Sequence, residues 1–318
     1  MMKTLSRRNL LRLGGGLLVC GSSLTAYAGL VEPNYRLEIT RYRIHPQRWT
    51  PGLKLKIAAL ADIHAGEGPV TPDHLAYIVE RTNHLNADMI VLLGDYLTGD
   101  YTRPGNMPAS AIAHELSRLR APLGTYAVLG NHDWWNDEKA LKKRCGPTEM
   151  GRTLEKSGIP VLKNEALKLV KDGFAFWLTG LDSQWSFFDL KNGAGDLPKT
   201  LGQITDDAPA IMLAHEPDIF PEITDRIALT MCGHTHGGQV RLFGYSPIVP
   251  SRYGNRYAYG HIMEDNKHLI VSGGVGSAGG SLYVANRSLG RRLGRWGHKK
   301  FYVRLGVPPE IVLVDVEQ

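Results

Sequence analysis

The chain has 318 residues, of which 43% are hydrophobic and 21% charged, a composition that suits a globular protein with a sizeable buried core. Its formal net charge of +6 arises largely from Lys3, Arg7, Arg8 and Arg12, which lie in a stretch without acidic residues. Without these four residues the charge falls to +2, so we expect no nucleic-acid-binding surface.

The N-terminal segment, residues 1–28, combines paired arginines with an apolar stretch. Arg7 and Arg8 precede an uncharged run from Leu13 to Val31, which contains the small-x-small pattern Ala26-Tyr27-Ala28. This arrangement resembles a twin-arginine export signal, and a basic N-terminal helix is the simpler alternative. The resemblance implies the twin-arginine export machinery as a partner, and a location in the periplasm or on the outer face of the cytoplasmic membrane. Cleavage after Ala28 is expected, but an uncleaved anchor stays open because the run approaches the ~20 residues of a spanning helix.

Residues 29–52 are expected to form an extended lead-in to a single domain at residues 53–318. Within that domain no composition shift, linker or internal repeat marks a second unit.

Short apolar runs that end on a polar residue recur through the domain and are typical of buried strands. Helical periods lie between them, including one through Leu75, Ile78 and Val79 that begins with Thr71 as a cap and Pro72 in its first turn. This alternation indicates a layered α/β fold, in which ligands gather beyond the carboxyl ends of the strands. The strands with polar ends are expected at residues 54–62, 89–95, 125–131, 210–215 and 227–234, and further strands at 174–181, 269–272 and 311–316.

The three cysteines, Cys20, Cys145 and Cys232, show no C-x-x-C spacing, which argues against structural zinc held by thiolates. A disulfide between Cys145 and Cys232 is an alternative in an oxidising compartment. Cys232 ends the apolar run from Ile227 to Met231, so we expect it to be a small buried hydrophobic residue instead.

Polar motifs follow the first two strands. Asp62-x-His64 places both side chains on one side of an extended backbone. In Gly94-Asp95, the missing side chain of the glycine permits a tight turn that leaves the carboxylate able to reach two ions. Each motif alone is weak, because such pairs also occur by chance on protein surfaces.

The later strand ends carry three more motifs. Gly130-Asn131-His132-Asp133 places an amide oxygen, an imidazole and a carboxylate on consecutive residues of a turn. His215 precedes Glu216-Pro217 and would, by itself, indicate a structural histidine. Gly233-His234-Thr235-His236-Gly237-Gly238 has two imidazoles flanked by glycines, which allow a ligand to approach the backbone closely.

Taken in order, D-x-H, G-D, G-N-H-D, H and G-H-T-H at successive strand ends resemble the calcineurin-like metallophosphoesterase family over roughly residues 53–316. The resemblance implies a layered α-β-β-α sandwich of two mixed sheets, with two divalent metal ions as cofactors. Carried over residue by residue, it implies these ligands: Asp62, His64 and His236 for the first ion, Asn131, His215 and His234 for the second, and Asp95 as the bridge between them.

His132 resembles the family's catalytic histidine, placed to protonate the leaving oxygen or to stabilise developing charge. Asp133 is expected to orient the His132 ring without touching the metals. Many relatives carry an acidic residue three positions after the aspartate of the G-D motif, whereas this sequence has Thr98, which is not a recognised ligand position. Other histidines, including His268, are expected to be solvated.

The implied ligands are oxygen and imidazole groups without thiolate, which suit manganese, iron or zinc and do not choose among them. Two such ions ~4 Å apart bind phosphoryl oxygens, lower the pKa of a bridging water and stabilise in-line displacement. The expected reaction is therefore hydrolysis of a phosphoester, as a phosphodiester or pyrophosphate, with metal-bound hydroxide as the nucleophile.

Within the family, the export motif and the sequence Gly233–Gln239 are most similar to exported bacterial phosphodiesterases and to UDP-2,3-diacylglucosamine diphosphatases. The expected substrate is a lipid-linked pyrophosphate, a membrane phosphodiester or a soluble nucleotide. Export argues against the diphosphatase role in lipid A synthesis, unless the N-terminal segment is an anchor that leaves the domain in the cytoplasm. A non-catalytic metal-binding scaffold is the alternative from another class, and the complete ligand set argues against it.

The segment Ser288–Arg304 concentrates basic residues in an otherwise balanced chain. Leu289, Leu293 and Trp296 recur at helical spacing, so the segment is a candidate for contact with an anionic bilayer. Its glycines weaken a helix, and a solvated basic loop is the alternative. The basic residues are Arg291, Arg292, Arg295, Lys299, Lys300 and Arg304, of which the first three are the candidate lipid or phosphate contacts.

Overall fold

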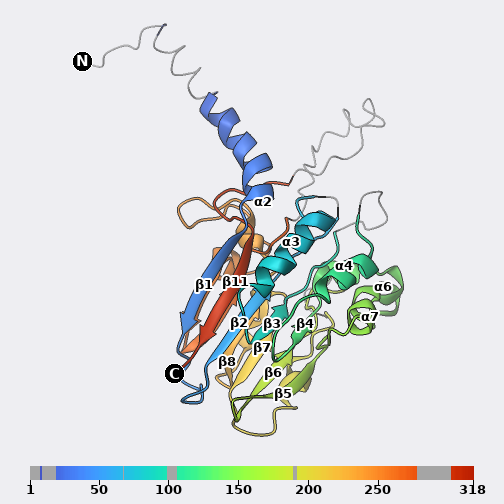
Figure 1. Cartoon of the computed structure of the whole chain (residues 1–318), viewed down its shortest axis with the longest axis vertical. Coiled ribbons are helices and arrows are strands. Elements are labelled where there is room, and N and C mark those ends of the chain that lie inside the picture. Colours follow the sequence, from blue (N-terminus) through green and yellow to red (C-terminus); the bar gives the residue numbers. More distant parts are fainter. Residues whose placement is uncertain (1–7, 9–18, 67, 99–105, 189–191, 278–301) are drawn as a thin grey trace, which may run out of the picture.

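Two mixed sheets form the centre of the molecule (Figure 1). A computed structural model describes residues 8, 19–66, 68–98, 106–188, 192–277 and 302–318. The first sheet has the strand order β1-β11-β2-β3-β4, with β1 at Glu38–Ile44, β2 at Leu55–Leu60, β3 at Met89–Leu92, β4 at Thr125–Ala127 and β11 at Glu310–Val316. The second has the order β5-β6-β7-β8-β10-β9, with β5 at Glu165–Lys171, β6 at Phe174–Gly180, β7 at Ala210–Leu213, β8 at Ile227–Cys232, β9 at Gly260–Glu264 and β10 at Lys267–Val271.

Side chains from alternate strand positions fill the space between the sheets. In β2, Ile57 and Ala59 belong to the cluster between the sheets, whereas Ala58 and Leu60 belong to the cluster beneath the helices. Leu229 of β8 packs in the same inter-sheet cluster. Strands that are buried on both faces carry apolar residues without alternation, which is why the sequence shows them as continuous apolar runs.

Helices cover the outer face of each sheet. Ile78, Ile112 and Leu154 of α3, α4 and α7 pack on the first sheet, and Phe220 of η2 packs on the second. The predicted α-β-β-α sandwich of two mixed sheets is therefore confirmed. The helices are α3 (Pro72–Asn83), α4 (Ala109–Leu116), α5 (Asn131–Trp135), α6 (Glu138–Lys143), α7 (Glu149–Lys156) and α8 (Leu197–Leu201), with short turns η2 (Pro217–Glu222), η3 (His236–Gly238) and η4 (Gly254–Tyr257).

The N-terminal part of the chain differs from the expected extended lead-in at residues 29–52. Residues 19–26 are helical, and η1 (Tyr27–Val31) and α2 (Glu32–Tyr35) continue the helix. The Ala28 carbonyl accepts the backbone N–H of Arg304 at 2.9 Å, and the buried Glu32 carboxylate accepts the N–H of Val307 at 2.9 Å. The lead-in prediction is wrong for residues 29–35, which are helical and belong to a helix that forms hydrogen bonds with the segment Arg304–Val307 near the far end of the chain.

The lead-in also contains a strand of the first sheet. β1 pairs in parallel with β11, in a register that aligns Glu38 with Glu310. The folded domain therefore begins before residue 53. Among the described residues, no helix has the length and apolar character needed to cross a membrane. Most of the predicted export signal, including Arg7, lies outside the described residues, as do Arg291, Arg292 and Arg295.

Two other sequence expectations have definite outcomes. Cys232 is buried in β8 and free, as predicted, and Cys145 is exposed and free. His268 is not solvated: it lies on β10, only 8% exposed, with its Nδ1 3.0 Å from Nε2 of His261 on β9. The prediction failed because β10 lies between β8 and β9 in the sheet, and the ring of His261 stacks on that of His268.

Candidate metal centre

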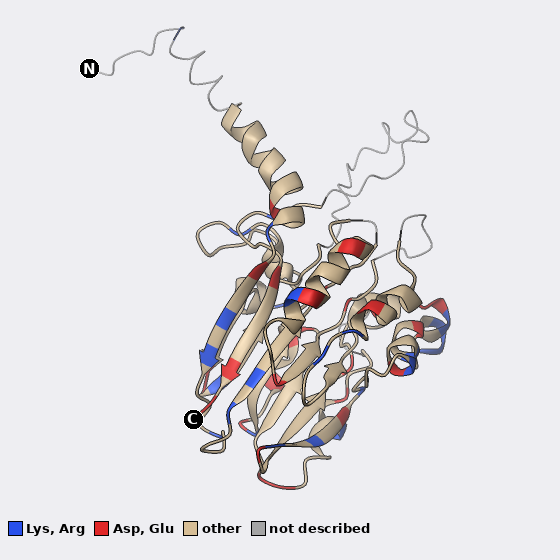
Figure 2. Cartoon of the chain, viewed as in Figure 1, with Lys and Arg blue, Asp and Glu red and all other residues tan. Residues whose placement is uncertain are grey.

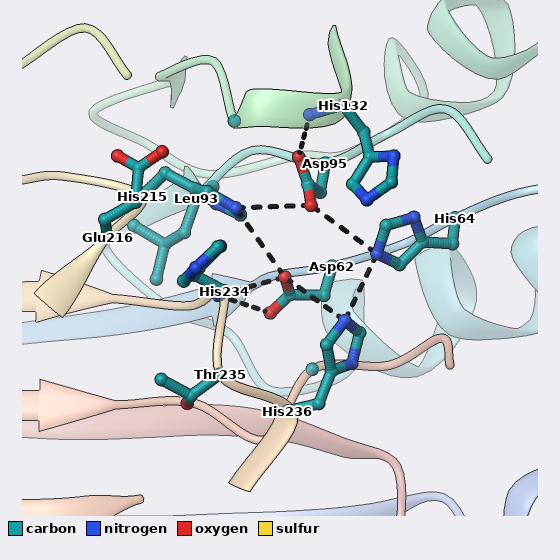
Figure 3. Close-up of polar contacts among 12 residues, drawn as sticks. Asp62, His64, Leu93, Asp95, His132, His215, Glu216, His234, Thr235 and His236 are labelled. Atoms are coloured by element: carbon teal, nitrogen blue, oxygen red, sulfur yellow. Dashed lines mark hydrogen bonds and ion pairs between the residues drawn. The ribbon is translucent and has the colours of Figure 1, made fainter. Parts of the chain in front are cut away.

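The predicted ligands converge where the strands of both sheets end. Figure 3 shows six of them facing one another across the gap between the sheets. All seven are buried, with at most 7% of any side chain exposed. β2 leads to Asp62 and His64, β3 to Asp95, β4 to Asn131, β7 to His215, and β8 to His234 and His236.

The carboxylates and imidazoles form two groups. Asp62, His64 and His236 offer ligand atoms that lie within 4.8 Å of one another. The atoms of Asp95, His215 and His234 meet the same limit. The two groups agree with the two ligand sets that the family resemblance implies. The one difference is that Asp95, expected as the bridge, lies within this distance limit of the second group.

Asp95 lies between the two groups. Its Oδ2 is 3.6 Å from His64 Nε2 and 3.3 Å from His215 Nε2, so one oxygen faces ligands of both sets. Its Oδ1 accepts the backbone N–H of His132 at 2.8 Å, which fixes the orientation of the carboxylate. This geometry suits a carboxylate that bridges two cations.

Glycines allow these loops to approach closely. A Cβ on Gly130 would lie 2.2 Å from Asp95 Oδ1, and one on Gly233 would lie 2.7 Å from Asp62 Oδ2. Gly94 has φ +93°, and a Cβ there would lie 2.5 Å from the nitrogen of Gly130. Side chains at these positions would therefore separate the strand ends that carry the ligands.

The ligand backbone is itself in an unusual conformation. Asp62, His64, Asp95, His234 and His236 all have φ between 43° and 72°, the left-handed region that side chains other than glycine rarely adopt. Such strain costs on the order of 1–3 kcal/mol per residue and persists where the surrounding structure enforces it. Five of the seven predicted ligands share this conformation, which fits the constrained backbone of a functional site.

Backbone carbonyls orient two of the imidazoles. His64 Nδ1 lies 3.0 Å from the carbonyl oxygen of Leu97, and His215 Nδ1 lies 2.6 Å from that of Leu93. A carbonyl can only accept, so each Nδ1 donates, and in the neutral ring Nε2 keeps its lone pair directed at the centre. This is the usual arrangement of a histidine that binds a metal.

The centre fits two divalent cations. Asn131 Oδ1 and His234 Nε2 are buried and have no hydrogen-bond partner among the described residues, so each is an unsatisfied acceptor. His64 Nε2 lies only 3.2 Å from His236 Nε2. Burial lowers the pKa of His64 to about 4 and that of His234 to about 3, so both imidazoles are neutral near pH 7. Against the effect of burial, Asp95 raises the pKa of His215 well above its usual value, so this ring must lose a proton when a cation binds. Imidazoles, carboxylates and an amide oxygen together match manganese, iron or zinc.

His132 lies beside the centre, and Asp133 does not orient it. The His132 ring lies edge-on to His64, with centroids 5.0 Å apart, and lines the adjacent pocket. The Asp133 carboxylate accepts the backbone N–H groups of Gly130 and Asp95, both at 2.9 Å, and those of Tyr96 and Leu97. Both of its oxygens are thus occupied by the backbone, so the expected role is wrong: Asp133 joins the two ligand loops to each other.

Arg304 is a second departure from the sequence expectation. Its side chain is fully buried, so it does not belong to a basic surface segment. The guanidinium donates to the carbonyls of Gly273 (2.6 Å), Gly276 and Val307 (3.0 Å), and Nη2 lies 3.2 Å from His236 Nδ1. Burial lowers the pKa of Arg304 to about 10, which leaves a positive charge beside one ligand of the first group.

Glu216 is a third residue whose role the sequence analysis did not assign. It is fully buried next to His215, and its carboxylate accepts Ser183 Oγ at 2.5 Å and the N–H of Gln184 at 3.0 Å. Burial raises the pKa of Glu216, and His215 opposes that shift. These hydrogen bonds fix the loop that carries Trp185, whose ring lies edge-on to His234 at 4.7 Å.

A pocket of about 270 Å³ adjoins the two groups. Asp95, Asn131 and His132 lie on its wall, and much of the rest is apolar or aromatic. Its apolar lining comes from Trp135, Trp185, Ile248 and Pro250. The site therefore combines a polar metal-binding wall with an apolar wall that can contact an organic substituent.

A two-sheet sandwich with two buried ligand groups at its strand ends defines the class of dinuclear metallohydrolases. A comparison with known families agrees: the model of the calcineurin-like phosphoesterase family matches residues 55–238. The chain belongs to this family and is a metal-dependent phosphoester hydrolase, for which two divalent metal ions are the cofactor.

Relatives of similar length resemble this chain over most of its sequence. The uncharacterized metallophosphoesterase YkuE of Bacillus subtilis is 32% identical over 86% of this chain and 92% of its own. The phosphodiesterase YaeI of Escherichia coli is 30% identical over 86% of this chain and 93% of its own. The solved structure of the NAD nucleotidase NadN from Haemophilus influenzae aligns with 72% of this chain and 46% of that one, at 17% identity and a TM-score of 0.47.

Proposed function

We propose that the protein hydrolyses phosphodiester or pyrophosphate bonds at the cell envelope. The observation that carries this proposal is the position of Asp95, whose Oδ2 faces histidines of both ligand groups. A site that can hold two cations side by side is suited to phosphoryl transfer to water.

The proposed assignment of ligands follows the two groups. Two divalent ions would supply Lewis-acid activation of the phosphoryl group and a nucleophile at neutral pH. His132 would donate a proton to the leaving oxygen, because it lines the pocket next to the centre without belonging to either group. The first ion is assigned to Asp62, His64 and His236, the second to Asn131, His215 and His234, and Asp95 to both.

Two observations favour a diester or pyrophosphate over a monoester. A diester places a second substituent next to the phosphorus, and Trp135 and Trp185 provide an apolar wall for it. The relative YaeI is named a phosphodiesterase. A lipid-linked substrate, including the diphosphatase alternative, fits the same wall.

The envelope location rests on the sequence of the N-terminal segment. Arg7 and Arg8 before an uncharged run favour twin-arginine export, which carries folded proteins and so suits a chain that collects its metals first. The domain would then act in the periplasm or on the outer face of the cytoplasmic membrane.

Replacement of Asp95 tests the proposed function. Asp95→Asn should abolish hydrolysis of bis(p-nitrophenyl) phosphate and lower the bound metal, because a neutral amide is a poor bridge between two cations. The matched control is Asp172→Asn, the same change at an exposed turn between β5 and β6, which should keep both activity and metal. If the Asp95→Asn variant binds two ions and has near-normal turnover, Asp95 is not a bridging ligand of the metal centre.

A further inference from the structure

An exposed apolar turn lies after the metal-binding loop of β8. Leu242 and Tyr245 exchange backbone hydrogen bonds at 2.9 and 3.0 Å, which closes a tight hairpin around Phe243 and Gly244. Phe243 is fully exposed, Ile248 is 79% exposed, and Tyr245 is 62% exposed. We call Leu242, Phe243, Tyr245 and Ile248 the apolar tip.

The backbone of the tip is strained at its exposed aromatic residue, Phe243. Phe243 has φ 51° and Gly244 φ 80°, so both central residues of the turn are left-handed. The first of these positions ordinarily holds asparagine, aspartate or glycine, and a phenylalanine there is uncommon. A strained, exposed phenylalanine is therefore more consistent with a contact surface than with a solvated loop.

The tip borders the metal centre. Ile248 lines the pocket together with Asp95 and His234, and Pro250 follows it on the same wall. A surface that receives the tip would therefore meet the opening of the pocket.

The N-terminal helix reaches the same end of the molecule. Val240 pairs with Leu305, whose neighbour Arg304 donates its backbone N–H to Ala28 of the helix. Residues 304 and 305 therefore contact both the segment that leads to the tip and the N-terminal helix. Figure 1 shows the helix projecting from this end of the molecule. The helix exposes further apolar side chains, among them Val19 (65%), Leu24 (50%) and Leu30 (65%).

The charge of this end suits an anionic, amphiphilic partner. Residues 19–31 and 242–251 contain no charged residue, and Figure 2 shows most of the projecting helix in the tan of uncharged residues. No aspartate or glutamate occurs from Gln239 to Met263. At the base of the tip, Arg241 hydrogen-bonds Ser246 and Asn255 and pairs with no carboxylate among the described residues.

We propose that the N-terminal segment is retained, and that its helix docks together with the apolar tip on an anionic lipid bilayer, so that the metal pocket opens at the membrane surface. The inference rests on the proposed hydrolytic function and adds that the substrate is a phosphoester presented by lipid. A turn that projects single side chains suits insertion among lipids, whereas a stable protein interface buries about 800 Å² on each partner. Arg241 would lie at the level of the anionic headgroups.

Lipid quenching of a fluorescent label tests the docking surface. The full chain, with Cys20→Ser and Cys145→Ser, is labelled at Phe243→Cys and bound to vesicles of phosphatidylcholine and phosphatidylglycerol in a 3:1 ratio with brominated acyl chains. The control label is at Val170→Cys, which is also exposed but lies near the opposite end of the strands. We expect quenching at least ~3-fold stronger at position 243 than at position 170. Equal quenching at both positions, or disulfide-linked dimers of the unlabelled Phe243→Cys chain together with no quenching of the labelled chain, would overturn the proposal.

Kinetics with soluble and vesicle-borne diesters test the consequence for substrate. Phe243→Ser with Tyr245→Ser should raise KM for a diacylglycerol p-nitrophenyl phosphodiester in these vesicles by ~10-fold, because less enzyme docks. Hydrolysis of soluble bis(p-nitrophenyl) phosphate should not change, and the exposed pair Val170→Ser with Met263→Ser should alter neither rate. Equal losses on both substrates would overturn the proposal. If the metal-loaded wild type cleaves neither diester, the hydrolytic function fails, and the quenching experiment still decides whether the tip docks.

Discussion

At the residue scale, two side chains outside the ligand sets approach the metal centre from different elements. His132, on α5, lines the pocket where the leaving group would lie. Arg304, just before β11, is buried against His236 and does not itself line the pocket. The first is therefore expected to act on the substrate and the second on a metal ligand.

His132→Ala should retain metal and lose rate by ~10²- to 10⁴-fold if the imidazole acts as general acid. A p-nitrophenyl leaving group needs little protonation, so its hydrolysis should suffer less than that of an alkyl diester. Rate measurements on both substrates, with metal analysis, check this, and His84→Ala on an exposed helix end is the control. Equal losses on the two substrates would exclude the proton-donor role.

Arg304→Lys should weaken metal binding by ~10- to 100-fold, because a partner of a metal ligand typically contributes that much to affinity. Lysine keeps the charge but cannot reproduce the planar fork that joins His236 to the carbonyls of Gly273 and Gly276. Calorimetric titration with Mn²⁺ measures the effect, with the exposed Arg256→Lys as the control. An unchanged affinity for Mn²⁺ would show that Arg304 contributes to packing and not to metal binding.

The convergence of the seven predicted ligands could be expected from the sequence, whereas the contacts of Asp133 and Arg304 could not. Ligands follow apolar runs and have glycine neighbours, such as Gly94 and Gly233, so their positions and types are visible in the chain. Asp133 was expected to orient His132, but three of its partners are N–H groups from a loop 36 to 38 residues earlier, and the fourth is the N–H of Gly130. Arg304 was counted with surface basic residues, and only its apolar neighbours in the sequence suggested burial.

At the element scale, strands with buried apolar runs were predicted, whereas the partly exposed edge strands β1, β5 and β9 were not. β2, β3, β4, β7 and β8 lie within the predicted apolar runs. β1 pairs with β11, more than 260 residues later, and was expected only as extended chain. The N-terminal helix depends likewise on the segment Arg304–Val307, so no local pattern indicated that it belongs to the folded body.

Glu32→Ala tests whether this helix is part of the fold. The change removes the acceptor of the Val307 N–H and leaves that buried donor unsatisfied, which should lower the free energy of unfolding by about 1–3 kcal/mol. Urea denaturation measures it. The control is Glu138→Ala, an exposed i,i+4 partner of Lys142, where we expect a loss within about 0.5 kcal/mol. Equal small effects would indicate that the helix contributes nothing to stability.

At the scale of the whole molecule, the fold gathers its distinctive features at one end. The carboxyl ends of strands from both sheets bring the seven predicted ligands together, and the same end carries the pocket, the apolar tip and the N-terminal helix. The opposite end carries the β5–β6 turn, which has no part in the site. This arrangement is what the proposed docking on a membrane requires. It follows from the order of the strands in the two sheets and not from any single motif.

A titration of the metal-stripped protein with Mn²⁺ tests the dinuclear centre most directly. Bound manganese is measured by plasma mass spectrometry while the rate of bis(p-nitrophenyl) phosphate hydrolysis is followed at each addition. We expect no hydrolysis without metal, and a rate that reaches its maximum as the second ion binds per chain, because Asp62, His64 and His236 form one group and Asp95, His215 and His234 the other. Hydrolysis by the metal-free chain, or a maximal rate at one ion per chain, would contradict the assignment.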